Sequence, residues 1–233
     1  MPNLPIDKRM LKGVRVVSLD AMDTVIALRE APGAVYARIA SECGLEANPS
    51  EVDARFPKVF RELERRKPCY DFAGEGARSW WDQAVAETLG FAASSRDPRL
   101  QSAQRRLFDF YASAEPWRLV DDHVVEHLGG LRARGLGVVF ASNFDFRLRR
   151  ILQELRIPAE ELFLSGEIGL QKPDPRFFEH VLHVLRLGPD ALLHVGDHPQ
   201  KDVDAPQQLG IRALLLHSPS FRSLGDLLSD DPK

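Results

Sequence analysis

Two kinds of hydrophobic pattern alternate along the chain, and the change between them predicts the architecture. A short β-branched apolar run from Val14 to Leu19 predicts a buried strand. After Leu28, apolar residues recur at three- and four-residue spacing and the segments break at Gly or Pro, a pattern typical of helices. The predicted helices lie over residues 32–44, 50–67, 74–90 and 97–113. This part of the chain is therefore expected to be all helical.

From about Trp117 onward, short apolar strands alternate with longer amphipathic helices. The predicted strands are 136–142, 163–165, 191–196 and 211–216, and the predicted helices are 121–134, 145–155, 175–186 and 200–209. Strands separated by helices of ten or more residues indicate a parallel sheet with right-handed crossovers. We therefore predict an α/β fold with a doubly wound, Rossmann-like core formed by residues 1–28 and 117–233. Residues 29–116 are expected to form a helical cap over the carboxyl ends of its strands.

Composition and charge narrow the classes of protein to which the chain can belong. Its 233 residues carry a formal net charge of −3, with no long run of one sign, which argues against a nucleic-acid partner. No segment approaches the roughly 18 apolar residues of a membrane span, and the first fifteen residues lack the apolar stretch of a signal peptide. Two unpaired cysteines favour a reducing compartment. We expect a cytoplasmic protein with a small-molecule partner; the sequence carries no signal for its oligomeric state.

Polar residues follow four successive strand or loop segments of the predicted sheet. Because the carboxyl ends of parallel strands meet along one crevice, these residues are expected to converge there. They are Asp20, the pair Ser142 and Asn143, Lys172 in GLQKPDP, and Asp197 with Asp202 in HVGDHPQKD.

The residue types at these positions suit phosphoryl transfer. The Asp20 carboxylate can attack a phosphoryl group and form an aspartyl-phosphate intermediate. Asp20 and Asp197 would repel each other unless a cation lay between them, and a carboxylate-rich oxygen site suits Mg²⁺. Lys172 can neutralise the nucleophile, while the Ser142 hydroxyl and neighbouring backbone amides can hold phosphate oxygens.

These motifs, in this order, resemble the haloacid dehalogenase superfamily, whose pattern is an aspartate nucleophile, a Ser or Thr, a Lys and an acidic metal pair. The D-x-x-D-T motif at 20–24, SNFD at 142–145, KPDP at 172–175, HVGD at 194–197 and the paired tryptophans 80 and 81 resemble the group of haloacid-dehalogenase-like hydrolase domain-containing protein 3. The resemblance implies a helical, C1-type cap inserted after the first motif. It also implies Mg²⁺-dependent phosphatase activity on a small phosphorylated metabolite.

The resemblance also assigns roles to individual residues of this chain. Asp20 and Lys172 would be catalytic, and Thr24, Ser142 and Asn143 would bind phosphate. The metal ligands would be Asp20, the backbone carbonyl of Met22, Asp197 and Asp202. On residue type alone, Thr24, Ser142 and Asn143 also suit plain turns or caps, and Asp202 suits the first turn of a helix.

The first motif departs from the superfamily's prevalent D-x-D-G-T at one chemically important position. Met22 stands where the second aspartate would protonate the leaving oxygen, and a thioether cannot transfer a proton. Asp23 occupies the glycine position, where an aspartate is favoured because it tolerates unusual backbone angles. His198 is a second possible proton donor, although a loop histidine is more often simply solvated. Turnover is therefore expected to be slow.

Two further functions stay open beside the phosphatase. Loss of the acid also suits a noncatalytic binding or regulatory protein that keeps the fold. Carbon-attacking 2-haloacid dehalogenases likewise lack the second aspartate, but they need no metal, and the retained Asp197 and Asp202 argue against that branch.

The predicted cap is rich in aromatic residues. They either line a pocket for a planar leaving group or pack within the helical bundle, and packing is the more common role of such residues. The set comprises Tyr36, Tyr70, Phe72, Trp80 and Trp81.

Overall fold

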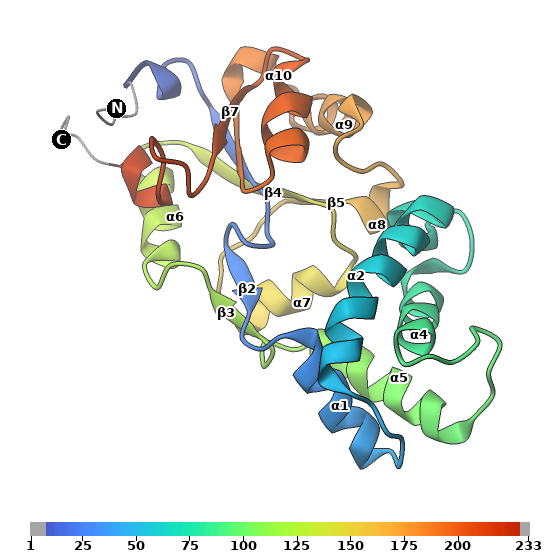
Figure 1. Ribbon diagram of the computed structural model, residues 1–233. Coiled ribbons are helices and arrows are strands. Elements are labelled where there is room, and N and C mark those ends of the chain that lie inside the picture. Colours follow the sequence, from blue (N-terminus) through green and yellow to red (C-terminus); the bar gives the residue numbers. More distant parts are fainter. Residues whose placement is uncertain (1–7, 229–233) are drawn as a thin grey trace.

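A five-stranded parallel sheet forms the centre of the molecule in a computed structural model that describes residues 8–228 (Figure 1). The strand order is β5-β4-β1-β6-β7, with β1 in the middle. Leu19, the last residue of β1, pairs with Phe140 of β4 and Val195 of β6. The strands are β1 (Val16–Leu19), β4 (Gly137–Ser142), β5 (Leu162–Leu164), β6 (Leu192–Gly196) and β7 (Arg212–Leu215). The predicted doubly wound α/β fold is confirmed.

Helices cover both faces of this sheet, as a sheet with β-branched and leucine residues on both faces requires. One face packs against α6 (Val124–Ala133) and α7 (Arg147–Glu154). The other face packs against α9 (Pro175–Leu185) and α10 (Ala205–Gln207). Shorter turns complete the core: η1 (Lys8–Leu11), α8 (Ser165–Ile168), η2 (Pro189–Ala191) and η4 (Leu224–Leu227).

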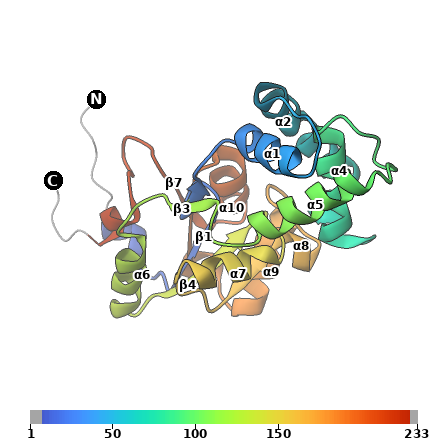
Figure 2. The ribbon, with the colours of Figure 1, turned by 90° about the horizontal axis from the view of Figure 1, so that it is seen from below.

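A block of helices lies beyond the carboxyl ends of the strands (Figures 1 and 2). Its two longest helices begin with a proline, which lacks the N–H that would be unpaired in the first turn. The side chains of their N-cap residues, Asn48 and Asp97, accept hydrogen bonds from the free N–H groups that follow. The helices are α1 (Pro32–Glu42), α2 (Pro49–Arg66), α3 (Pro68–Asp71), α4 (Gly76–Thr88) and α5 (Pro98–Tyr111). Within residues 8–228, none of the helices combines the length and apolar character that crossing a membrane requires.

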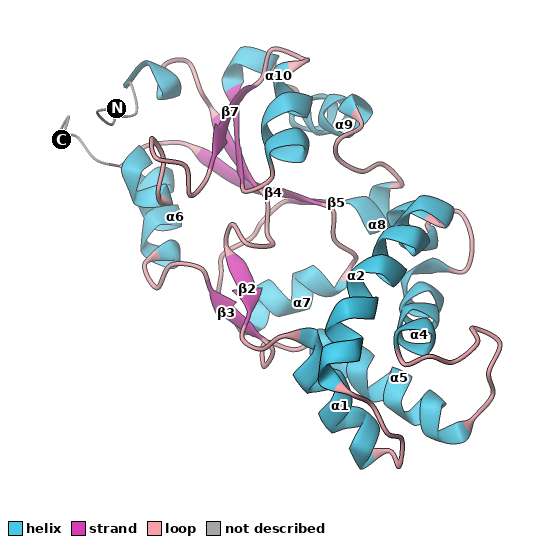
Figure 3. Ribbon diagram, in the orientation of Figure 1, coloured by secondary structure: helices cyan, strands magenta, loops and turns pink. Residues whose placement is uncertain are grey.

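Two of the differences from the sequence-based expectations lie near the site (Figure 3). A two-stranded antiparallel ribbon, β2 (Ile26–Leu28) with β3 (Trp117–Leu119), carries the chain into and out of the helical block and was not predicted. The expected helix 200–209 is instead a π-helical turn, η3 (Pro199–Asp204), followed by the short α10. A regular helix cannot continue there, because Pro206 has no N–H to donate to the carbonyl of Asp202.

Candidate active site

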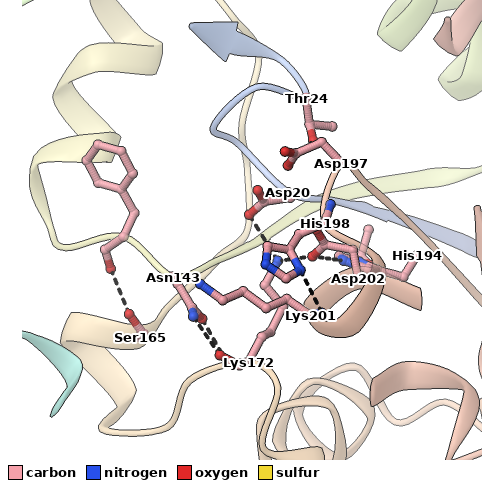
Figure 4. A network of polar contacts seen from close by, with 12 residues as sticks. Asp20, Thr24, Asn143, Ser165, Lys172, His194, Asp197, His198, Lys201 and Asp202 are labelled. Carbon is pink, nitrogen blue, oxygen red and sulfur yellow. Dashed lines mark hydrogen bonds and ion pairs between the residues drawn. The ribbon is translucent and has the colours of Figure 1, made fainter. Parts of the chain in front are cut away.

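Asp20 and Asp202 lie on either side of a buried lysine at the carboxyl end of the sheet (Figure 4). The Lys172 Nζ atom is 3.0 Å from Asp20 Oδ1 and 2.5 Å from Asp202 Oδ1. Lys172 and Asp202 are each only 1% exposed. Burial on its own would lower the pKa of Lys172, but the two carboxylates outweigh it and raise that pKa. Lys172 therefore carries a permanent positive charge beside the candidate nucleophile.

Asp197 completes a cluster of carboxylates at this site. One oxygen from each of Asp20, Asp197 and Asp202 lies within 4.8 Å of the others. Burial and the nearby Asp20 raise the pKa of Asp197 to about 6. The Thr24 hydroxyl donates to Asp197 Oδ1 at 3.5 Å, so Thr24, predicted as a phosphate ligand, contacts the acidic cluster. Lys172 contacts two of the three carboxylates, and within residues 8–228 no cationic side chain is paired with Asp197.

A buried polar chain lies behind Asp202 and was missed by the sequence reasoning. His194 Nε2 is 3.1 Å from Asp202 Oδ1, and His194 Nδ1 is 2.8 Å from the Ser18 hydroxyl. Burial lowers the pKa of His194. The neutral ring therefore donates to Asp202 and accepts from Ser18. A signal for this pair was present, because a Ser and a His each interrupt an otherwise apolar buried strand.

The Asp202 carboxylate accepts three hydrogen bonds. Its Oδ2 atom accepts the backbone N–H of His198 at 2.9 Å, which leaves Oδ1 for Lys172 and His194. Burial opposes ionisation, but the His194 hydrogen bond and the Lys172 charge lower the pKa of Asp202. Gly196 makes this position possible, because a Cβ atom there would lie 2.3 Å from the Asp202 carboxyl carbon.

The Ser142 and Asn143 side chains follow β4 at the same edge of the sheet. Ser142 is 2% exposed, and Asn143 exchanges two hydrogen bonds with the main chain of Lys172, at 2.7 and 2.8 Å. The Asn143 amide therefore fixes the loop that presents Lys172 (Figure 4). Its predicted role as a phosphate ligand stays a prediction.

The first motif ends in a tight turn. Asp23 has φ 54° and donates its backbone N–H to the Ile26 carbonyl at 2.7 Å. The expectation that Asp23 is present because it tolerates left-handed backbone angles is confirmed. His198 is exposed and its ring accepts the Lys201 backbone N–H at 3.4 Å. It therefore caps its own turn, in accord with the expectation that it is not a proton donor.

The helical block is fastened to the loops that carry the site. The Tyr70 hydroxyl donates to the Asn143 carbonyl at 3.0 Å, and the Cys69 N–H donates to the Gln171 side chain at 3.0 Å. Cys69, Tyr70 and Asp71 are consecutive left-handed residues with φ of 52°, 56° and 59°. That conformation costs roughly 1–2 kcal/mol per residue, and the two hydrogen bonds to the core offset part of the cost. The left-handed turn is what directs Tyr70 at Asn143.

A buried ion pair forms a second attachment. Arg147, 4% exposed, makes two hydrogen bonds of 2.7 and 2.8 Å to Asp145, which is 0% exposed. Trp81 of α4 donates its indole N–H to Asp145 at 2.7 Å. The Arg147 guanidinium also stacks 4.5 Å from the Trp81 ring and 4.7 Å from the Phe108 ring. Core and helical block therefore share one desolvated charge pair.

Comparison with known proteins identifies the family of this arrangement. A family model described as haloacid dehalogenase-like hydrolase matches residues 14–210. The chain belongs to the haloacid dehalogenase-like hydrolase family. It is 30% identical over 209 residues to haloacid dehalogenase-like hydrolase domain-containing protein 3 of Homo sapiens, covering 88% of this chain and 83% of that relative. The predicted resemblance to that group is confirmed.

Further relatives have names that cover more than one chemistry. A phosphoserine phosphatase of Thermus thermophilus is 27% identical over 228 residues, covering 86% of this chain and 88% of the relative. Among solved structures, a defluorinating L-2-haloacid dehalogenase matches with a TM-score of 0.68 at 18% identity, covering 96% of this chain and 91% of the other. The second match shows the fold alone.

Proposed function

We propose that the protein is a Mg²⁺-dependent phosphatase that hydrolyses small phosphate monoesters through Asp20. The observation that carries this proposal is the cluster of three carboxylates within 4.8 Å around one buried lysine. Three anions and one ammonium leave excess negative charge next to a nucleophile, and a divalent cation offsets that charge. An enzyme that attacks carbon has no need for such a cluster.

The residues suit hydrolysis in two displacements. Lys172 holds Asp20 Oδ1, so Oδ2 is the oxygen free to attack phosphorus. The bond to the ester oxygen breaks, and that oxygen leaves with the electron pair and takes a proton from water. Water then attacks the aspartyl-phosphate, releasing inorganic phosphate and restoring the Asp20 carboxylate. Lys172 stays protonated throughout and offsets charge on the transferred group.

The donor set fits Mg²⁺, a hard cation that prefers oxygen ligands. Asp20, Asp197 and the Met22 carbonyl would hold it. Asp202 was also predicted as a ligand, but its oxygens already accept three hydrogen bonds, so we assign it instead to positioning Lys172 and the loop. The raised pKa of Asp197 supports this assignment, because burial and the neighbouring carboxylates of Asp20 and Asp202 oppose its ionisation and a cation would relieve that repulsion. When bound, the ion would supply charge neutralisation for the phosphoryl oxygens.

Met22 sets the expected speed of the reaction. Loss of a general acid/base removes roughly 10²–10⁴-fold of rate, and a methionine provides no proton for the leaving oxygen. The enzyme should therefore be slow, and slowest with poor leaving groups.

Dehalogenation of a 2-haloacid is the second candidate. It is favoured by one observation, that Met22 borders an apolar cavity suited to a carbon skeleton. The match to a solved L-2-haloacid dehalogenase accords with it through the fold alone.

The test compares variants with phenyl phosphate and Mg²⁺, and with 2-chloropropionate without metal. We expect the wild type to release phosphate slowly, Asp20→Asn to lose activity, and Met22→Asp to raise kcat by roughly 10²-fold or more. Asp204→Asn, an exposed aspartate outside the carboxylate cluster, is the matched control and should retain the wild-type rate. Phosphate release that survives Asp20→Asn would refute the nucleophile. Halide release without phosphate release would favour the dehalogenase, and no turnover of either compound would favour a binding protein.

A further inference from the structure

A cavity of about 380 Å³ lies between the helical block and the core. Aromatic side chains from both sides line it, and the volume falls within the roughly 300–1,000 Å³ of small-molecule sites. The aromatic residues include Tyr36, Phe56, Phe60 and Trp81 from the block and Trp117 and Phe144 from the core. The sequence left two roles open for the cap aromatics, and both occur: Trp80 is 1% exposed and packs within the block, whereas Tyr36, Tyr70 and Trp81 also line the cavity.

The cavity lies next to the candidate reaction site, although neither Asp20 nor Lys172 is among its lining residues. Met22 and Asn143 are both part of its lining, and these residues lie two positions after Asp20 and beside Lys172. A group attached to a phosphoryl on Asp20 would thus enter a predominantly apolar space. Two arginines line it: Arg147 is already paired with Asp145, and Arg61 of α2 is an exposed residue of the helical block. The walls therefore favour a planar apolar body over a sugar or a polyol.

Met22 and the aromatic walls point to the same kind of leaving group. A phenol, with a pKa of about 10, departs far more readily without a proton than an aliphatic alcohol, whose acidity is close to that of water at about 15.7. An aryl ester is therefore the substrate that depends least on a general acid, which Met22 cannot provide. The Met22 thioether also continues the apolar wall where an aspartate would have to be desolvated.

Tyr111 also lines this cavity. Its hydroxyl is buried and, among the described residues, has no hydrogen-bond partner. Its ring centre is 6.4 Å from that of Tyr36. Burial raises the pKa of the Tyr111 phenol, so the group stays protonated and can donate. A buried donor without a partner costs free energy unless a ligand accepts from it.

We propose that the cavity binds the leaving group of the substrate, and that the substrate is an aryl phosphate monoester with a hydrogen-bond acceptor remote from the ester. This inference rests on the proposed phosphatase function. Asp20 attacks phosphorus, the P–O(aryl) bond breaks, and the aryloxide leaves with the electron pair and takes its proton from water. Water then releases phosphate from Asp20.

The kinetic test uses 4-acetylphenyl phosphate, 4-ethylphenyl phosphate and butyl phosphate with the Mg²⁺-loaded protein. We expect kcat/KM to be highest for the acetyl ester and lowest for the butyl ester. Tyr111→Phe should reduce the ratio of acetyl to ethyl ester by roughly 2–10-fold, the value of one hydrogen bond. Phe56→Ala should raise KM for both aryl esters. Phe91→Ala, a cap residue outside the cavity, is the control and should leave the ratios as in the wild type.

Calorimetric binding of free 4-hydroxyacetophenone separates this inference from the proposed function. Binding that is weakened by Phe56→Ala and Tyr111→Phe, together with no turnover of any ester, would support the assignment of the cavity as an aryl-binding site and refute the proposed phosphatase function. Turnover of butyl phosphate as fast as the aryl esters, with no effect of either variant, would support the phosphatase and overturn the cavity assignment. Absence of both binding and turnover would overturn both.

Discussion

Asp197→Asn is expected to stabilise the metal-free protein, although it removes a candidate metal ligand. Burial and Asp20 raise the pKa of Asp197 from 3.8 to about 6. A carboxyl whose folded-state pKa is raised opposes folding once it ionises. The free energy of unfolding of the wild type should therefore fall as the pH rises from about 4 to about 6. At about 1.36 kcal/mol per pKa unit the full penalty is about 3 kcal/mol. Because the group is only half-buried, screening reduces it to roughly 1–2 kcal/mol.

Thermal unfolding in chelator at pH 7 measures the effect. For a chain of this size, 1 kcal/mol shifts Tm by roughly 2–4 °C, so Asp197→Asn should unfold about 4 °C above the wild type. The difference should shrink as the pH falls from about 6 and vanish only below about pH 3, where the wild-type carboxyl is protonated in both the folded and the unfolded state. Mg²⁺ should raise the Tm of the wild type and leave the variant unchanged. Asp204→Asn, exposed on the next turn, is the control and should follow the wild type.

Two outcomes would refute this reasoning. A variant less stable than the wild type in chelator would mean that Asp197 is already neutralised by its neighbours. A variant with an undiminished response to Mg²⁺ would mean that the ion binds elsewhere.

Two further predictions concern packing around the site. Gly196→Ala should displace Asp202, cost roughly 1–3 kcal/mol in urea unfolding and lower kcat at least tenfold. The control is Gly129→Ala, at an exposed helical position with open space, which should be neutral or stabilising. Equal behaviour of the two variants would contradict the close approach of Gly196 to Asp202. Arg147→Met should cost about 3–5 kcal/mol because it leaves Asp145 charged and buried. The double variant with Asp145→Leu should recover most of this loss in the same urea assay, and a single-variant loss below about 1 kcal/mol would show that the pair is hydrated.

The sheet could be predicted because its strands are short runs of valine, leucine and phenylalanine bounded by turns. The ribbon β2–β3 could not, since each strand has three residues and pairs only with a segment about ninety positions away. The same holds for the attachments of the cap. Nothing local in the sequence relates Trp81 to Asp145, or sets Tyr70 in a left-handed turn that reaches Asn143.

Some residues of the candidate site could also be predicted from the sequence, whereas the contacts that support them could not. Asp20, Lys172, Asp197 and Asp202 could be found because each follows a strand or begins the next turn, and parallel strands end together. The support of Asp202 by His194 depends on which face of β6 meets the loop after β6, and that depends on register, which the sequence does not specify by itself.

The β2–β3 ribbon makes the helical block a single insertion between two paired strands. Leu28 pairs directly with Trp117, so the chain leaves the core and returns to it across one paired rung. A two-residue turn between these positions would close an ordinary β-hairpin and leave every strand of the parallel sheet in place. The Leu28–Trp117 pair closes the inserted segment, and the entropy cost of closing a loop grows only slowly with its length. The length of the inserted segment can therefore change without affecting the register of the parallel sheet. Exchange of whole caps between relatives would thus keep the sheet intact, but the new cap would have to replace the contacts of Cys69 and Tyr70 with the loops beside Lys172.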